Sequence, residues 1–82
     1  MDDFYYVYIL QSIADKNRYY VGLTNNLDKR LIIHNNGACA HTSKYCPWHI
    51  TNTIAFKEKA KAVAFEKYLK SHSGRAFAKK HF

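Results

Sequence analysis

The chain has few cysteine, proline and glycine residues. Its 82 residues include 2 cysteines, 1 proline and 3 glycines. Two cysteines are too few for the disulfide scaffold of a small secreted domain, so the fold has to rest on a packed core. No apolar run approaches the length that spans a bilayer, and the first residues, MDDF, are acidic where a signal peptide is basic. We therefore expect a cytoplasmic protein with reduced thiols and no membrane partner.

Acidic residues are also scarce. The chain carries 6 Asp and Glu against 13 Lys and Arg, which gives a net charge of +7. This balance favours a polyanionic partner, most often nucleic acid and less often an anionic membrane surface.

Aromatic side chains, in contrast, are abundant. The sequence has 7 Tyr and 5 Phe, and 48% of its residues are hydrophobic, which is too rich a composition for a disordered chain. A chain of this length forms one domain, so we expect a single domain over residues 1–82. Aromatic rings should form much of its core, and a large substrate has to lie across its surface.

Hydrophobic patterning predicts three strands. The run Phe4–Gln11 is nearly continuous in apolar residues, as in a central strand that is covered on both faces. A polar turn and the segment Tyr19–Val21 follow, which predicts an antiparallel hairpin whose second strand ends at Gly22. Trp48–Phe56 alternates between apolar and polar residues and is predicted as the third strand.

Three helices complete the expected order ββαβαα. They are predicted from about residue 26 to 34, from 57 to 71 and from 75 to 82. Thr24, Asn25 and Asn26 are all capping residue types before the first helix, and Asp28 stands where it could close a capping box with Asn25. Ser73 is the expected cap of the last helix. The chain is therefore predicted to be an α+β protein, with a three-stranded antiparallel sheet flanked by helices.

The segment YYVGLTNNLDKRLIIH, residues 19–34, brings reactive side chains close together. Tyr20 stands near a strand end, and Arg30 and His34 are 4 residues apart on one side of the next helix. A phenol, a guanidinium and an imidazole can together handle a phosphodiester. In isolation, a βα unit with two ordinary surface residues is the simpler interpretation, so the rest of the chain has to decide.

Two tripeptides strengthen the interpretation as a phosphodiester site: YVY at residues 6–8 and YVG at residues 20–22. The spacing to Arg30, the loop HTSKYCPW and the helix FEKYLK, which contains Glu66, follow in the same order. In this combination the chain resembles the GIY-YIG nuclease family, and specifically its small single-domain bacterial branch. The resemblance runs from Phe4 to about Phe82 and implies the GIY-YIG fold.

The resemblance also implies roles for five residues. Tyr8 and Tyr20 match the two motif tyrosines, and the second is usually held to activate or bind the attacking water. Arg30 matches the arginine that contacts the scissile phosphate, and His34 falls where relatives carry His or Tyr. Glu66 matches a carboxylate that binds one divalent ion, Mg²⁺ or Mn²⁺, held weakly without substrate. The general base stays open among Tyr8, Tyr20 and His34.

The chain departs from the family pattern at three places. Tyr6 replaces the glycine of the first motif, and Leu23 stands where many relatives have lysine. No asparagine beyond Glu66 matches the one found in larger members. The first position has only to fit a strand, whereas the other two bear on the strength of catalysis.

Basic residues outside the motifs are the expected contacts to the nucleic-acid backbone: Lys44, Lys67, Lys70 and Arg75. A merely solvated basic face is the plain alternative, and Glu66 with Lys70 also fits a helix ion pair. We predict a metal-dependent endonuclease acting on DNA, including branched or single-stranded forms. The alternative is a nucleic-acid-binding module without turnover. Selectivity then comes from a protein partner, a homo-oligomer or the loop at residues 38–48.

A third hypothesis concerns that loop alone. Cys39, His41, Cys46 and His49 read C-x-H-x₄-C-x₂-H, which permits a zinc- or redox-responsive structural site. The spacing does not match a common zinc knuckle. Residues 41–45 are more simply expected to form a polar lip that contacts phosphates.

Overall fold

A computed structural model gives the fold and describes residues 4–37 and 42–82. The elements in chain order are β1 (Tyr5–Ser12), β2 (Tyr19–Thr24), α1 (Leu27–Asn35), the short 3₁₀ helix η1 (Ser43–Tyr45), β3 (Trp48–Phe56), α2 (Lys59–Lys70) and α3 (His72–His81). The predicted order ββαβαα is confirmed. Within the described ranges, no helix combines the length and apolar character needed to cross a bilayer.

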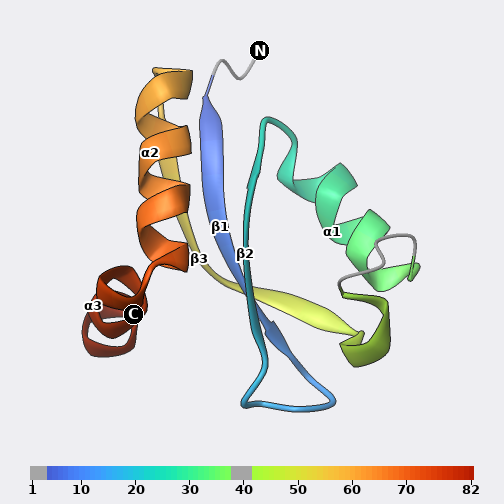
Figure 1. Cartoon of the computed structure of the whole chain (residues 1–82). Helices are drawn as coiled ribbons and strands as arrows, with labels where there is room; N and C mark the ends of the chain where they lie inside the picture. Colours follow the sequence, from blue (N-terminus) through green and yellow to red (C-terminus); the bar gives the residue numbers. More distant parts are fainter. Residues whose placement is uncertain (1–3, 38–41) are drawn as a thin grey trace.

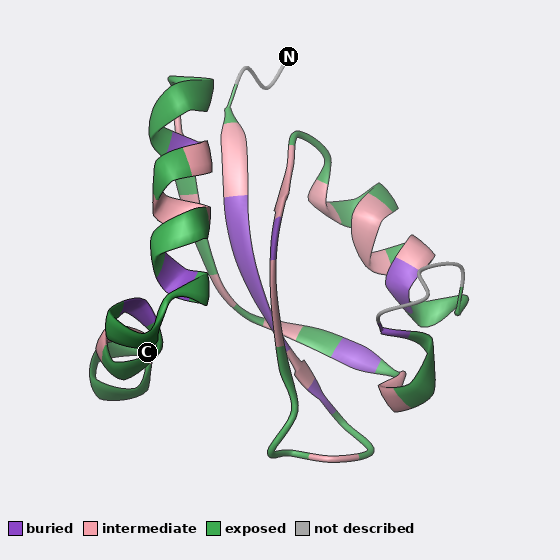
Figure 2. Cartoon of the chain, in the orientation of Figure 1, coloured by how far each residue is buried: buried purple, intermediate pink, exposed green. Residues whose placement is uncertain are grey.

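β1 is the central strand of a three-stranded antiparallel sheet with the order β2-β1-β3, as predicted. Helices cover both faces of this sheet: α2 and α3 lie on one side and α1 lies on the other (Figure 1). Four successive residues of β1, Val7 to Leu10, are buried, which is visible as a continuous band along the strand (Figure 2). Since neighbouring side chains of a strand point to opposite faces, β1 contributes to two separate cores.

The two cores differ in chemistry. On the α2 side, Val7 and Ile9 pack with Ala62 and Leu69 in an aliphatic cluster. On the α1 side, Tyr8 and Leu10 pack with Trp48, and further aromatic rings surround them. Aromatic rings contribute to both cores, as expected: they are Tyr8, Trp48, Tyr20 and Tyr45 on the α1 side and Tyr5, Phe56, Phe65 and Phe77 on the α2 side.

Gly22 lies inside β2 rather than at its end, because the strand continues to Thr24. It is paired with Tyr8 across the sheet. A Cβ atom at position 22 would collide with the Tyr8 ring, and even the Cε1 atom would be only 2.9 Å away. Glycine is needed here for the close approach of a ring, not for a turn as the sequence suggested.

Of the three cap candidates before α1, the structure uses Asn26. Its side chain accepts the Lys29 N–H at 3.1 Å. Both asparagines are good caps, and the choice is fixed by Thr24, whose hydroxyl oxygen accepts the Asn26 N–H at 3.1 Å. The expected partner of Asn25, Asp28, lies in the first turn of α1.

α3 begins earlier than predicted, at His72 rather than Arg75. Ser71, not Ser73, is its cap and accepts the Gly74 N–H at 3.1 Å. The early start requires Gly74. A Cβ atom there would lie 2.7 Å from the Leu69 Cα and would overlap the backbone carbonyl of Tyr68. α2 and α3 are thus joined through one residue, and α3 lies at the C-terminal end of α2 (Figure 1).

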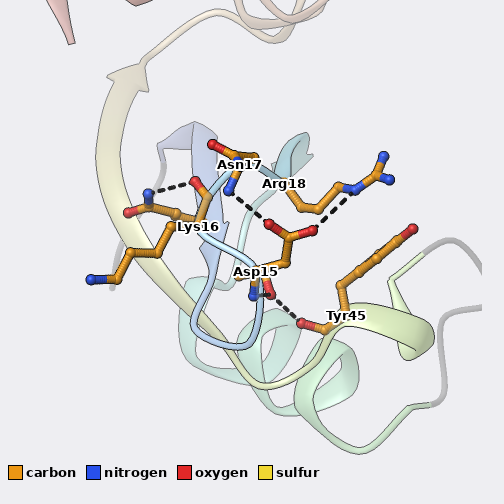
Figure 3. A network of polar contacts seen from close by, with 7 residues as sticks. Asp15, Lys16, Asn17, Arg18 and Tyr45 are labelled. Atoms are coloured by element: carbon orange, nitrogen blue, oxygen red, sulfur yellow. Dashed lines mark hydrogen bonds and ion pairs between the residues drawn. The ribbon is translucent and has the colours of Figure 1, made fainter.

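The turn of the β1–β2 hairpin is tied to η1 (Figure 3). The Ser12 hydroxyl donates to the Tyr45 carbonyl at 2.6 Å and accepts the Asp15 N–H at 2.9 Å. The Asp15 carboxylate accepts the Asn17 N–H at 3.1 Å and lies 3.5 Å from Arg18 Nε. The Arg18 guanidinium is also 4.7 Å from the centre of the Tyr45 ring. These contacts hold the η1 segment against the sheet.

Candidate active site

Four of the residues singled out by the motif spacing meet on the α1 face of the sheet. β1 supplies Tyr8, β2 supplies Tyr20, and α1 supplies Arg30 and His34. Tyr8 is 2% exposed because it stands on the central strand beneath α1. The structure therefore brings together the side chains predicted to be catalytic.

A chain of hydrogen bonds runs through the middle of this cluster. Tyr8 Oη and His34 Nε2 are hydrogen-bonded at 2.9 Å, and His34 Nδ1 and Thr42 Oγ1 at 2.8 Å. His34 and Thr42 are both fully buried. At the outer end of the chain, Arg30 Nε donates to Tyr8 Oη at 3.4 Å. Both ring nitrogens of His34 are thus engaged by hydroxyl groups.

The surroundings of His34 keep it neutral. Burial, and secondly the positive charge of Arg30, lower the pKa of His34 below its ordinary value of 6.5. A neutral imidazole carries one N–H donor and one acceptor nitrogen. His34 can therefore take up a proton from a neighbouring hydroxyl, whereas an imidazolium could only donate.

The Tyr20 ring lies beside the hydrogen-bonded side chains of Tyr8 and His34. Its ring centre lies 4.9 Å from that of His34 and 6.4 Å from that of Tyr8. Tyr20 is half-buried, and within the described residues its hydroxyl has no hydrogen-bond partner. The phenol of Tyr20 is therefore the part of the cluster best placed to meet a substrate.

Glu66 lies on α2, in the layer across the sheet from α1 (Figure 1). Its carboxylate accepts a hydrogen bond from Lys70 Nζ at 2.9 Å, and its side chain is 19% exposed. Lys70 Nζ in turn lies 5.8 Å from the centre of the Tyr20 ring. The helix ion pair considered as an alternative role for Glu66 is therefore present, and it sits at the β2 edge beside the cluster.

A metal site made by protein side chains alone is not found in the parts of the chain that the structure covers: no group of three or more His, Cys, Asp or Glu there could hold an ion. One carboxylate still fits Mg²⁺, which keeps several of its waters and often takes only one or two protein ligands beside substrate phosphates. The donor set at Glu66 suits a hard cation that arrives with its substrate.

The predicted nucleic-acid contacts are divided between the two faces. Lys44 is exposed on η1, and its Nζ lies 5.7 Å from the centre of the Tyr45 ring. Lys67, Lys70 and Arg75 are exposed on α2 and α3, across the sheet from His34.

Thr42 is the residue that sequence reasoning misjudged. It was expected in an exposed polar lip, but it is fully buried beneath His34. Its carbonyl accepts the Trp48 Nε1–H at 2.8 Å, and the Asn35 side chain accepts the Trp48 backbone N–H at 2.6 Å. A threonine 8 residues after the histidine was the only available signal, and the intervening loop hid its meaning.

The zinc hypothesis falls partly outside the described residues, because Cys39 and His41 lie there. Of the other two, Cys46 packs beside the aromatic core and its thiol donates to the Ser43 carbonyl at 3.2 Å. His49 is an exposed residue of β3.

This small α+β fold gathers two tyrosines, an arginine and a histidine on one face of its sheet. Such an arrangement suits phosphodiester chemistry. Comparison with protein families identifies the group: residues 4–80 match the model of the GIY-YIG catalytic domain. The chain therefore belongs to the GIY-YIG family, as its motifs predicted. A search of curated proteins found no matching relative. GIY-YIG domains are generally endonucleases that depend on a divalent metal, and a nuclease domain implies nucleic acid as a partner.

Proposed function

We propose that the chain is a metal-dependent endonuclease that hydrolyses phosphodiester bonds in DNA, including branched or single-stranded forms. Tyr8, Tyr20, Arg30, His34 and Glu66 are the proposed site residues. The observation that carries the proposal is the buried hydrogen-bond chain that ends at Arg30, because it joins a proton acceptor to a fixed positive charge. Selectivity then rests with a protein partner, a homo-oligomer or the loop before β3.

Arg30 is the proposed phosphate-binding group. A guanidinium has five N–H donors in a planar fork, and Nε of Arg30 is directed to Tyr8. The fork can present two parallel donors to a phosphate, and its charge stabilises the extra negative charge of the transition state. Because Arg30 Nε donates to Tyr8 Oη, a phosphate bound by the fork would lie beside the phenol.

Tyr8 and His34 form the proposed proton relay. In this arrangement His34 Nδ1–H donates to Thr42 Oγ1, so that Nε2 accepts the Tyr8 hydroxyl. Tyr8 passes its proton to His34 as it accepts one from the attacking water, and Arg30 stabilises the phenolate character that develops. Tyr20 then binds the phosphate or orients that water. This assigns the base to Tyr8 with His34 behind it.

Glu66 is the proposed metal ligand. Glu66 would hold one Mg²⁺ or Mn²⁺ together with the substrate, and the ion would supply charge neutralisation at the phosphate and the leaving oxygen. The existing pair with Lys70 does not prevent this, because Lys70 is 47% exposed and such helix pairs are worth only about 0.3–0.5 kcal/mol. The same Lys70, once released, lies close enough to Tyr20 to meet a phosphate.

A cleavage assay with Mg²⁺ or Mn²⁺ on single-stranded, duplex and branched DNA and on RNA tests the proposal. Tyr20→Phe, Arg30→Ala and Glu66→Ala should each lower kcat by about 10²–10³, as loss of one charge-stabilising group does. Lys29→Ala, an exposed lysine on α1, is the matched control and should keep full activity.

Binding of nucleic acid without metal-dependent cleavage of any of these substrates would overturn the nuclease proposal. That outcome would support the alternative, a binding module with the nuclease fold. The observation that favours this alternative is the Glu66–Lys70 pair, which already occupies the only carboxylate assigned to the metal.

A further inference from the structure

A second concave surface lies on the other side of the sheet. It is an open hollow of about 890 Å³ between α3 and the part of the sheet near the hairpin turn, and we call it the α3 hollow. All three strands and both helices of this layer contribute to its walls. Four basic residues and no acidic residue line it; the basic ones are Arg18, Lys70, Arg75 and Lys79. Its charge therefore suits a polyanion.

Two of these cations are well placed to bind. Arg75 and Lys79 are 4 residues apart on α3, so they project from one side of the helix. Both are exposed, and neither forms an ion pair with any described residue. Arg18 differs, because its guanidinium is held by Asp15 and the Tyr45 ring (Figure 3). Arg75 and Lys79 are thus the main charged groups of the hollow.

An aromatic ring is fixed on the floor of the hollow. Tyr19 is 61% exposed. Its hydroxyl accepts a hydrogen bond from the Gln11 amide at 3.1 Å, and the same amide donates to the Lys16 carbonyl at 2.9 Å. A ring that is held in place and exposed to solvent can stack on a nucleobase, and cations beside such rings are typical of single-strand binding.

The α3 hollow is continuous with the candidate active site. Tyr20 and Lys70 line the hollow, and Lys70 Nζ lies over the Tyr20 ring at the β2 edge. A nucleic acid that occupies both places has to pass around this edge of a domain that measures 32 × 32 × 18 Å. Duplex DNA is stiff over about 150 base pairs and resists such a turn, whereas a single strand follows it easily. The geometry therefore selects a single strand.

We propose that the α3 hollow binds the single-stranded segment next to the phosphate that is cut. Arg75 and Lys79 contact its backbone phosphates, and Tyr19 stacks on one of its bases. This inference rests on the proposed function for its link to cleavage, but the binding surface can be measured by itself.

The test is the affinity of the full chain for a labelled oligothymidylate, measured by fluorescence anisotropy in EDTA at several salt concentrations. The double variant Arg75→Gln/Lys79→Gln should bind at least tenfold more weakly. The slope of log affinity against log salt should fall by about 1.4, since each phosphate contact to a single strand contributes about 0.7. Lys57→Gln/Lys59→Gln removes the same charge away from the hollow and should change the affinity less than twofold.

Tyr19 gives a test that does not depend on charge. Tyr19→Ala should weaken binding about tenfold, as loss of one stacking ring does. Tyr19→Phe keeps the stacking ring but loses the hydroxyl that Gln11 holds, so its affinity should lie between those of the wild type and Tyr19→Ala. Circular dichroism should show the same melting transition in all variants, because Tyr19, Arg75 and Lys79 are exposed.

Three outcomes would each overturn the inference. They are an equal loss of affinity in the hollow and control variants, tighter binding of duplex than of single-stranded DNA, and no single-strand binding by the wild type. Failure of the inference is distinct from failure of the nuclease proposal. A wild type that cuts while the hollow variants still bind normally contradicts the hollow alone. A wild type that binds through the hollow but cuts no substrate contradicts the nuclease alone.

Discussion

The two faces of the sheet are built from alternate residues of the same strand, yet they have different chemistry. Val7 and Ile9 enter an apolar core under α2, whose fully buried members are aliphatic and whose margin includes aromatic rings. Tyr8 and Leu10 enter a core under α1 that also contains buried His34 and Thr42. Every buried side-chain polar atom among the described residues has a hydrogen-bond partner. The α1 face thus combines packing with a connected polar network.

Because of this difference, the α2-facing residues of β1 contribute mainly to stability, whereas its α1-facing residues also belong to the polar network of the candidate site. A buried polar network is costly unless its members are all satisfied, so the positions of Tyr8, His34 and Thr42 depend on one another. On the α2 face no polar network links the positions of the side chains. Its residues act mainly through the area and volume that they fill. Neighbouring residues of β1 should therefore respond differently to substitution.

The largest effect is expected from comparing Val7→Ala with Tyr8→Phe. Val7 is fully buried, and loss of its two methyl groups should cost about 2–3 kcal/mol of unfolding free energy, with kcat per folded molecule unchanged. Tyr8→Phe keeps the ring but removes the hydroxyl between Arg30 and His34, so cleavage should fall about 10²–10³-fold. Urea denaturation and single-turnover cleavage measure the two quantities. Comparable activity in the two variants would show that Tyr8 is only a core residue.

The same contrast explains what the sequence could predict. The central position of β1 follows from its continuous apolar run, because only a strand covered on both faces tolerates one. The meeting of Arg30 and His34 follows from helical spacing, and both expectations are confirmed. Local periodicity is therefore enough for elements and for side chains within one element.

Contacts between elements were harder to predict. Thr42 reaches His34 across a loop that has no periodicity, so no spacing rule connects them. Gly22 was assigned to a turn because its real cause, the ring of Tyr8 on the neighbouring strand, depends on strand register. The cap of α1 stayed open among Thr24, Asn25 and Asn26, and the cap of α3 was predicted two residues late, because residues of equal capping ability stand close together at both places.

A smaller effect is expected at the inner end of the network. Thr42→Val keeps the shape but removes the hydroxyl that meets His34 Nδ1, which should cost about 1–3 kcal/mol of stability because a buried polar atom loses its partner. The imidazole is then free to adopt the other tautomer, so cleavage should fall about tenfold while KM stays unchanged. Thr42→Ser restores the hydroxyl and should recover most of the activity. If Thr42→Val and Thr42→Ser behave alike, the hydroxyl has no part in positioning His34.

The smallest effect is a pH dependence that belongs to the α1 face alone. The pKa of His34 is lowered in the folded state, so below the ordinary value of 6.5 the unfolded chain binds a proton that the folded chain resists. Stability should therefore be complete above pH 6.5 and decline as the pH falls from 6.5 to the lowered pKa. His34→Gln should remove this decline from melting temperatures measured between about pH 7.5 and 5. His49→Gln alters an exposed histidine of β3 and should leave the decline intact. An equal decline in wild type and His34→Gln would mean that the buried imidazole is not the group that titrates.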